Sequence, residues 1–186
     1  MQQPAAEGGP GESGPVSSLR PVAEHHGSCT SPATEADLQS LASSLRSAGD
    51  ADELLAAGSL QVRQPGIPAS VAALWREASE WHFSRNHYGC FGLNIFPPSG
   101  LVELTTQVFG DLECRGDWRS AEQQQQQQQP GPSVAQPGWL VLAAFSEYDY
   151  LFCCFDAQSP HFGHVCLATV SPAREFFVRP LLCARR

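Results

Sequence analysis

The densest apolar and aromatic pattern of the chain lies between residues 138 and 169. Residues 139–145 are continuously apolar, over the length of a buried strand rather than of a helix. Residues 148–156, which follow a polar break, are rich in aromatic side chains, and residues 165–168 form a third apolar stretch. Short connections favour antiparallel pairing, because a parallel return needs a longer crossover. The pattern therefore predicts three antiparallel strands.

The second of these strands is expected at the centre of the sheet. Alternate side chains of a strand point to opposite faces, and here both sets are apolar. One set consists of Tyr150, Phe152 and Cys154, and the other of Leu151, Cys153 and Phe155. We therefore expect other elements to cover both faces of this strand.

Two capping boxes predict short helices in the N-terminal half. Thr34 followed by Asp37 predicts a helix that carries leucines on one face and ends near Gly49. These leucines are Leu38, Leu41 and Leu45. Asp50 followed by Glu53 predicts a second helix, which contains Leu54 and Leu55.

The strongest helical periodicity follows the break at residues 65–68, where Pro68 suits a first helical turn. Its apolar stripe consists of Val71, Leu74, Trp75, Ala78 and Trp81. Such a stripe packs against the core more often than against a partner protein. We therefore interpret it as a core-facing helix that reaches Trp81.

The remaining segments predict one more strand and two more helices. Residues 88–96 are expected to form a strand, and the residues from Leu101 a short helix that stops at Gly110. Ser171 and Pro172 form a strong helix-start signal. That last helix would direct Phe176 and Phe177 into the core and would end or kink at Pro180.

Two regions lack the apolar residues that a core needs. Residues 1–33 are rich in Gly, Pro, Ser, Ala and Glu, so a disordered low-complexity N-terminus is expected. Residues 111–137 contain the tract Gln123 to Gln129 and are interpreted as a disordered insertion. As a simple repeat the tract needs no function, although an interaction or aggregation segment is the alternative. The domain organisation is thus a single folded unit over residues 34–182.

Several local motifs occur in a particular order along this unit. Ile67-Pro68 opens a helix that carries Leu74 and Trp75. A strand through Phe91 and Ile95 precedes the short helix at residues 101–104. The later motifs are Trp139-Leu140-Val141, the aspartate-flanked strand 149–156, the Gly163-His164-Val165 turn and a closing helix over residues 173–181.

This order of motifs resembles the SUKH superfamily, which includes fungal cell-wall assembly regulators and bacterial toxin-immunity proteins. The resemblance covers about residues 50–182, interrupted by the glutamine insertion. It implies an α+β domain with a mainly antiparallel sheet of about four strands and helices packed against it. It also implies a non-catalytic domain that acts in regulation by binding another protein.

Composition excludes some classes of function and partner. The formal net charge of -8 argues against a nucleic-acid partner, which needs a basic surface. No apolar run approaches the roughly 20 residues of a membrane span, so no membrane contact is expected. The seven cysteines are scattered and follow no disulfide pattern. We expect reduced thiols in a cytoplasmic protein, with the nucleus left open, and a monomer or weak oligomer.

The cysteines and histidines allow two alternatives, a metal-binding module and a thiol enzyme. His161 and His164 lie near Cys153, Cys154 and Cys166 in the sequence, a combination that suggests a zinc-stabilised module. No known ligand spacing supports this, so buried thiols and turn histidines are preferred.

The second alternative is a small thiol-dependent hydrolase. It would pair Cys90 or Cys154 with His87 or His164. Two further carboxylates, Asp149 and Asp156, were considered for acid–base chemistry and are interpreted as turn residues. No catalytic residue, cofactor or metal is therefore assigned.

A partner-binding surface is expected in the connections beside the strand ends, where binding residues concentrate. Five residues are its candidates: Arg85, His87, Tyr88, His161 and Phe162. Trp81 lies near the same connections but is equally suited to the core.

Overall fold

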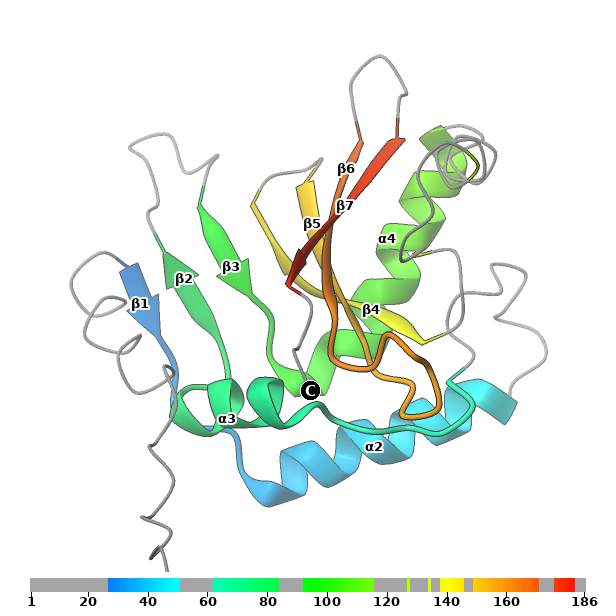
Figure 1. Ribbon diagram of the computed structural model, residues 1–186. Coiled ribbons are helices and arrows are strands. Elements are labelled where there is room, and N and C mark those ends of the chain that lie inside the picture. The colour runs from blue at the N-terminus through cyan, green and yellow to red at the C-terminus, as the bar shows by residue number, and fades with distance from the viewer. Residues whose placement is uncertain are drawn as a thin grey trace, which may run out of the picture.

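A seven-stranded sheet with three α-helices makes up the part of the chain that the computed structural model describes (Figure 1). This part comprises residues 27–50, 62–83, 92–115, 138–145, 149–170 and 176–182, together with Gln127 and Val134. The helices are α2 (Glu35–Asp50), α3 (Ala69–Glu77) and α4 (Leu101–Arg115), preceded by a 3-10 turn at Pro98–Gly100. The strands are β1 (Gly27–Cys29), β2 (Trp81–Phe83), β3 (Leu93–Ile95), β4 (Trp139–Ala144), β5 (Asp149–Cys154), β6 (Val165–Val170) and β7 (Phe176–Leu182).

The strands lie in the sheet in the order of the sequence, and every neighbouring pair is antiparallel. This confirms the α+β class and the three C-terminal strands that the apolar pattern predicts. The expected number of about four strands is wrong, since the sheet has seven. Two of the additional strands, β1 and β2, have three residues each, which is too short for an alternating pattern to identify them.

Both faces of the central strand β5 are covered, as its apolar alternation predicts. Leu151, Cys153 and Phe155 pack in a core with residues of α2 and α3. Tyr150, Phe152 and Cys154 pack in a second core with Val108 and Phe109 of α4. Figure 1 shows α2 and α3 below the strands and α4 (green) rising beside the β4–β7 half of the sheet. Strand β5 thus has the core of α2 and α3 on one face and the core of α4 on the other.

A shift of register in β4 is matched by a polar contact with α4. The pairing with β5 shifts between Val141 and Ala143. The N–H of Val141 donates to the Thr105 hydroxyl at 3.0 Å, and this hydroxyl donates to the Leu101 carbonyl at 2.6 Å. Thr105 is fully buried. A buried backbone N–H needs a partner, and Thr105 supplies it from the helix.

Helix α2 begins with the predicted capping box. The Thr34 hydroxyl accepts the N–H of Asp37 at 3.2 Å, and the Thr34 N–H donates to the Asp37 carboxylate at 2.7 Å. These contacts with Thr34 lower the pKa of the Asp37 carboxyl, because hydrogen bonds to the carboxylate stabilise its charged form. The predicted leucine face is buried, and the helix continues through Gly49 to Asp50. The second capping box leads into residues 51–61, which lie outside the described residues.

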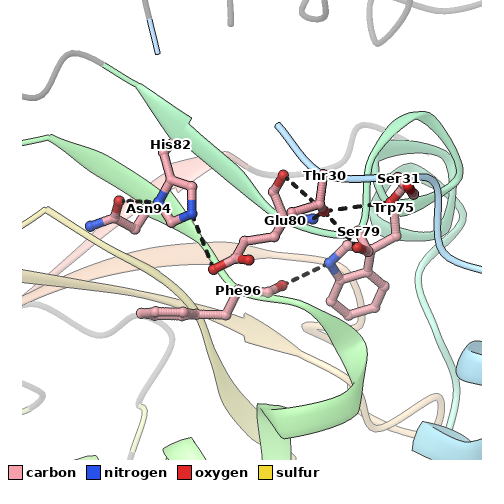
Figure 2. Close-up of polar contacts among 8 residues, drawn as sticks. All are labelled: Thr30, Ser31, Trp75, Ser79, Glu80, His82, Asn94 and Phe96. Carbon is pink, nitrogen blue, oxygen red and sulfur yellow. Dashed lines mark hydrogen bonds and ion pairs between the residues drawn. The ribbon is translucent and has the colours of Figure 1, made fainter. Parts of the chain in front are cut away.

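Helix α3 is shorter than its apolar stripe predicts. It ends at Glu77, Ala78 is extended, and Trp81 belongs to β2. The turn after α3 is held by the segment that follows β1, because Ser79 N–H donates to the Ser31 carbonyl at 2.9 Å. Figure 2 shows this contact region, where Glu80 N–H also donates to the Thr30 hydroxyl at 2.9 Å. Trp81 extends the stripe because a strand that follows the helix faces the same core.

The predicted C-terminal helix is wrong: Phe176–Leu182 form strand β7. Six register pairs join β7 to β6, among them Pro180 with Cys166. β7 is the last strand of the sheet, and an edge strand tolerates proline because one side of its backbone needs no partner. Sheet pairing therefore overrides the local helix signal. Ser171 and Pro172 lie outside the residues that the structure describes.

Two predicted region boundaries also differ from the structure. Strand β1 lies inside residues 1–33, so ordered structure includes Gly27–Cys29. Helix α4 continues beyond Gly110 to Arg115, and Val134 is fully buried in the second core. The expected insertion 111–137 therefore contributes to the fold at both of these points. Of the strand predicted at residues 88–96, Leu93–Ile95 form β3, and residues 84–91 are not described.

Candidate functional site

The thiols of the C-terminal strands are buried rather than reactive. Cys153, Cys154 and Cys166 are fully buried and are not in disulfide bonds. Burial raises the pKa of the Cys153 thiol far above its usual range, and it also raises the pKa of Cys154. A nucleophilic cysteine needs the opposite shift, toward the thiolate. Cys154 is therefore unsuited to the thiol-hydrolase chemistry considered from the sequence. Cys90 and His87, its alternative pair, lie outside the described ranges.

This burial leads to a prediction about alkylation. In the native protein we expect Cys153, Cys154 and Cys166 to remain unmodified by iodoacetamide, and to react fully once denaturant opens the sheet. The half-exposed Cys29 is the internal control, because it should react in the native state. Mass spectrometry of the alkylated peptides measures each site. Rapid alkylation of Cys154 in the native protein would contradict this interpretation and support a thiol-dependent mechanism.

Asp156 is a structural residue at the end of β5. Its carboxylate accepts backbone N–H groups of Gln64 at 3.2 Å and Gln158 at 3.1 Å. Asp156 is buried, and its backbone forms an isolated β-bridge with Pro65. Asp149 is in register with Thr169 at the other end of β5. The two carboxylates therefore lie at opposite ends of one strand, in agreement with the sequence interpretation.

The connection from β5 to β6, residues 157–164, is held by a dense set of backbone hydrogen bonds; we name it the histidine turn. Gly163 N–H donates to the Cys154 carbonyl at 2.9 Å, and Cys154 N–H donates to the His164 carbonyl at 3.1 Å. His164 N–H donates to the His161 carbonyl at 2.8 Å. Gly163 has φ +76°, a left-handed conformation that favours glycine. The turn therefore positions its side chains rigidly.

Two imidazoles meet in this turn. The Nδ1 atoms of His161 and His164 are 3.4 Å apart, and the ring centroids are separated by 5.3 Å. The ring of the fully buried Trp139 lies 6.2 Å from that of His161 and forms one wall beside it. Both histidines are partly exposed. Partial burial, with a smaller contribution from His164, lowers the pKa of His161, so this ring favours its neutral form.

Two of the five predicted partner-binding residues are placed by the structure. His161 and Phe162 are partly exposed and adjacent in the histidine turn. The Phe162 ring lies against Gly66, where an added Cβ would come within 3.2 Å of it. Arg85, His87 and Tyr88 belong to residues 84–91, which the structure does not describe. Trp81, considered near this surface, is fully buried and stacks on Phe83.

A second histidine, His82, lies in a polar group that the sequence analysis missed. Figure 2 shows its Nδ1 2.7 Å from the Asn94 side-chain oxygen, and its Nε2 lies 3.2 Å from the Glu80 carboxylate. Both ring nitrogens are thus occupied by neighbours, so neither is available to a substrate as a base. No sequence signal identified this group, because β2 has only three residues and His82 meets Asn94 only through the pairing of β2 with β3.

The histidine–cysteine cluster of the zinc alternative is only partly present. His161 and His164 come together, but their cysteine neighbours in sequence face the cores. Within the described ranges, no group of three or more His, Cys, Asp or Glu residues is arranged to hold a metal ion. In the same part of the chain, no helix has the length and apolar character to cross a membrane.

Comparison of the whole chain with protein-family models, with curated proteins and with solved structures finds no match. The candidate site is therefore defined by geometry alone. It is the histidine turn, in which rigid backbone presents His161, Phe162 and His164 beside the buried Trp139.

Proposed function

We propose that this chain is a non-catalytic protein-binding domain of SUKH type, and that the histidine turn is part of its contact surface. One observation carries the proposal: rings of His161, Phe162 and His164 are partly exposed on a backbone that hydrogen bonds hold at both ends. Ring side chains on rigid backbone lose little conformational entropy on binding, and they often dominate the energy of protein interfaces.

The chemical groups elsewhere in the described part favour binding over catalysis. The three strand thiols are buried, and burial raises the pKa of Cys153 and Cys154. His82 has neighbours at both ring nitrogens, and the Asp156 carboxylate is occupied by backbone N–H groups. These groups therefore serve the structure, whereas His161, Phe162 and His164 of the histidine turn are partly exposed.

The SUKH type is proposed on the order of the elements. The helix after Ile67-Pro68, the strand β3, helix α4 and the strands β4–β6 occur in the order that the resemblance gives, with the additional strand β2 between α3 and β3. The closing helix of that pattern is replaced by β7. The proposal therefore depends on the elements between α3 and β6 and makes no use of the C-terminal segment.

The test is a double substitution, His161→Ala with Phe162→Ala, in the full chain. Affinity enrichment with the tagged protein identifies partners, and a binding titration with each purified partner measures affinity. We expect the double variant to weaken binding by at least about 30-fold, as for hot-spot residues of about 2 kcal/mol or more. A matched control, Gln39→Ala with Ser43→Ala, changes two exposed residues of α2 and should leave affinity unchanged.

Thermal unfolding and circular dichroism of each variant establish that it folds. The proposal is contradicted if every partner binds the folded double variant as tightly as it binds the parent protein. It is also contradicted if the α2 control loses as much affinity as the double variant, because binding would then belong to another surface.

A further inference from the structure

We propose that the pair of His161 and His164 makes the histidine turn sensitive to acid. While at least one of the two rings is neutral, a hydrogen bond joins them and the turn keeps its conformation. When both rings are protonated, this bond is lost, the rings repel each other and the hydrogen bonds of the turn loosen. The effect on the turn is independent of any partner, whereas its consequence for binding rests on the proposed function.

The contact between the two rings requires an uncharged imidazole. The Nδ1 atoms of His161 and His164 are 3.4 Å apart, and the ring centroids are separated by 5.3 Å. A neutral imidazole has one donor and one acceptor nitrogen, whereas both nitrogens of a charged imidazole donate. A hydrogen bond between two Nδ1 atoms therefore needs one that carries a proton and one that does not. A second proton would place two N–H groups against each other.

Repulsion between the rings is the larger effect of this second proton. Hydrogen bonds from a ring N–H usually span about 2.7–3.2 Å, so the bond of 3.4 Å that would be lost is a weak one. Two like charges this close disfavour each other's protonation. Burial lowers the pKa of His161, and the charge of His164 lowers it further. The pair therefore takes up its second proton only below the ordinary pH range of imidazole.

The direction of the pH effect follows from the lowered pKa of His161. The folded state favours the neutral ring, so this stabilisation of the turn is complete above the unfolded imidazole pKa of about 6.5. It declines as the pH falls from there through the lower pKa of the folded ring. Acid, rather than base, therefore loosens the turn.

Other ionisable side chains near the turn belong to β5, to β6 and to the segment before α3. Cys154 and Cys166 are buried thiols, and the carboxylate of Asp156 accepts two backbone N–H groups. Arg63 is exposed, and its guanidinium stays charged at any physiological pH. β4 contributes the uncharged ring of Trp139. The two imidazoles are therefore the groups of this region whose ordinary titration lies between about pH 5 and 8.

The rings are coupled to the backbone that closes the turn. His164 N–H donates to the His161 carbonyl at 2.8 Å, and Gly163 N–H donates to the Cys154 carbonyl at 2.9 Å. Separation of the rings would pull on the first of these bonds, because it joins the same two residues. Phe162 lies between the two histidines in the sequence, so its position in the proposed contact surface would change with the turn.

Hydrogen exchange of the full chain at about pH 7.5 and about pH 5 tests the inference. After correction for the intrinsic effect of pH, the amides of Gly163 and His164 should exchange at least about tenfold faster at the lower pH. The amide of Val141, which donates to the buried Thr105, is the internal control and should keep its protection. Equal acceleration at Val141 would contradict the inference, because acid would then unfold the sheet as a whole.

His161→Asn and His164→Asn are the informative variants, because asparagine places an uncharged amide near the position of Nδ1. In each variant the exchange of Gly163 should change by less than about twofold between the two pH values, since only one imidazole remains. His82→Asn is the matched control, because it makes the same replacement at the histidine of β2. It should keep the acid response of the parent protein.

Ring nuclear magnetic resonance of the unsubstituted protein covers the case in which a variant fails to fold. The imidazoles of His161 and His164 should take up their protons in two separate steps, as expected for coupled groups. The inference is overturned if the two rings titrate together in one step. It is also overturned if Gly163 and His164 exchange equally at both pH values, or if both asparagine variants respond as the parent does.

These measurements involve no partner, so they separate the acid response from the proposed binding function. If no protein binds the histidine turn, the proposed function fails while the acid response remains. If a partner binds through His161 and Phe162 but amide exchange in the turn is independent of pH, the acid response alone is overturned.

Discussion

Replacing Trp75 by alanine is expected to lower the free energy of unfolding by about 3–5 kcal/mol, the range for deletion of a large buried aromatic side chain. Trp75 is fully buried and stacks on Phe155 with ring centroids 6.1 Å apart. Its indole N–H donates to the Phe96 carbonyl at 2.9 Å, as Figure 2 shows. The substitution would remove the contacts that Trp75 makes with Phe155 and Phe96 and leave the Phe96 carbonyl without its donor. Urea unfolding followed by circular dichroism measures the change.

The control is Trp75→Phe, which keeps an aromatic ring but lacks the indole N–H. We expect it to destabilise the fold by less than the alanine variant, since most of the apolar area remains. The interpretation of Trp75 as the link between helix and sheet fails if the alanine variant unfolds at the same urea concentration as the parent protein.

The second large effect is expected at Gly138, the residue that leads into β4. Gly138 has φ +94°, and a Cβ built on it would lie 2.6 Å from the Cβ of Asp156. Phe155 N–H also donates to the Gly138 carbonyl at 2.7 Å, so the backbone cannot move away without losing a hydrogen bond. Strained backbone and steric overlap together are expected to lower the free energy of unfolding of Gly138→Ala by about 2–4 kcal/mol.

Gly110→Ala is the matched control, because the same atom is added at an exposed position within α4. No atom lies within 4 Å of a Cβ built on Gly110. Alanine in a helix interior is more stable than glycine by about 0.5–1 kcal/mol, so this variant should unfold at a higher urea concentration than the parent. If both alanine variants shift stability in the same direction and by the same amount, the argument from the conformation of Gly138 is wrong.

The strands that sequence reasoning located are those long enough to show a pattern and buried enough to be apolar. In β4 and β5, burial on both faces leaves continuous apolar stretches, and the alternation of β5 assigns its side chains to the two cores correctly. The capping box of α2 was recognisable because its hydrogen bonds are local. Local chemistry and dense apolar patterns were therefore sufficient for most of the helices and strands in the described part of the chain.

The remaining elements depend on partners distant in the sequence. Strand β1 exists through its pairing with β2, and β7 through its pairing with β6. The start signal at Ser171-Pro172 suggests a helix because propensity is local, whereas pairing with β6 decides the outcome. For the same reason Trp81 was assigned to the end of a helix, although β1 and β3 hold it in a strand.

The candidate site was predictable in composition but not in geometry. The spacing of His161 and His164 identifies a possible pair, but their mutual approach depends on the turn conformation at Gly163. The cysteines nearest in sequence alternate on β5, so Cys153 faces one core and Cys154 the other. Proximity in sequence therefore suggested that more side chains come together than the two histidines that do.

The position of the glutamine tract between two packed elements has a consequence for its length. The tract, Gln123 to Gln129, joins α4, which ends at Arg115, to β4, which starts at Trp139, and these two elements pack against each other. The connection that contains the tract is thus anchored by α4 before it and by β4 after it. Closing a loop becomes harder only with the logarithm of its length, by about 0.6 kcal/mol per doubling. Variants with more or fewer glutamines in the tract should therefore have the same fold and nearly the same free energy of unfolding.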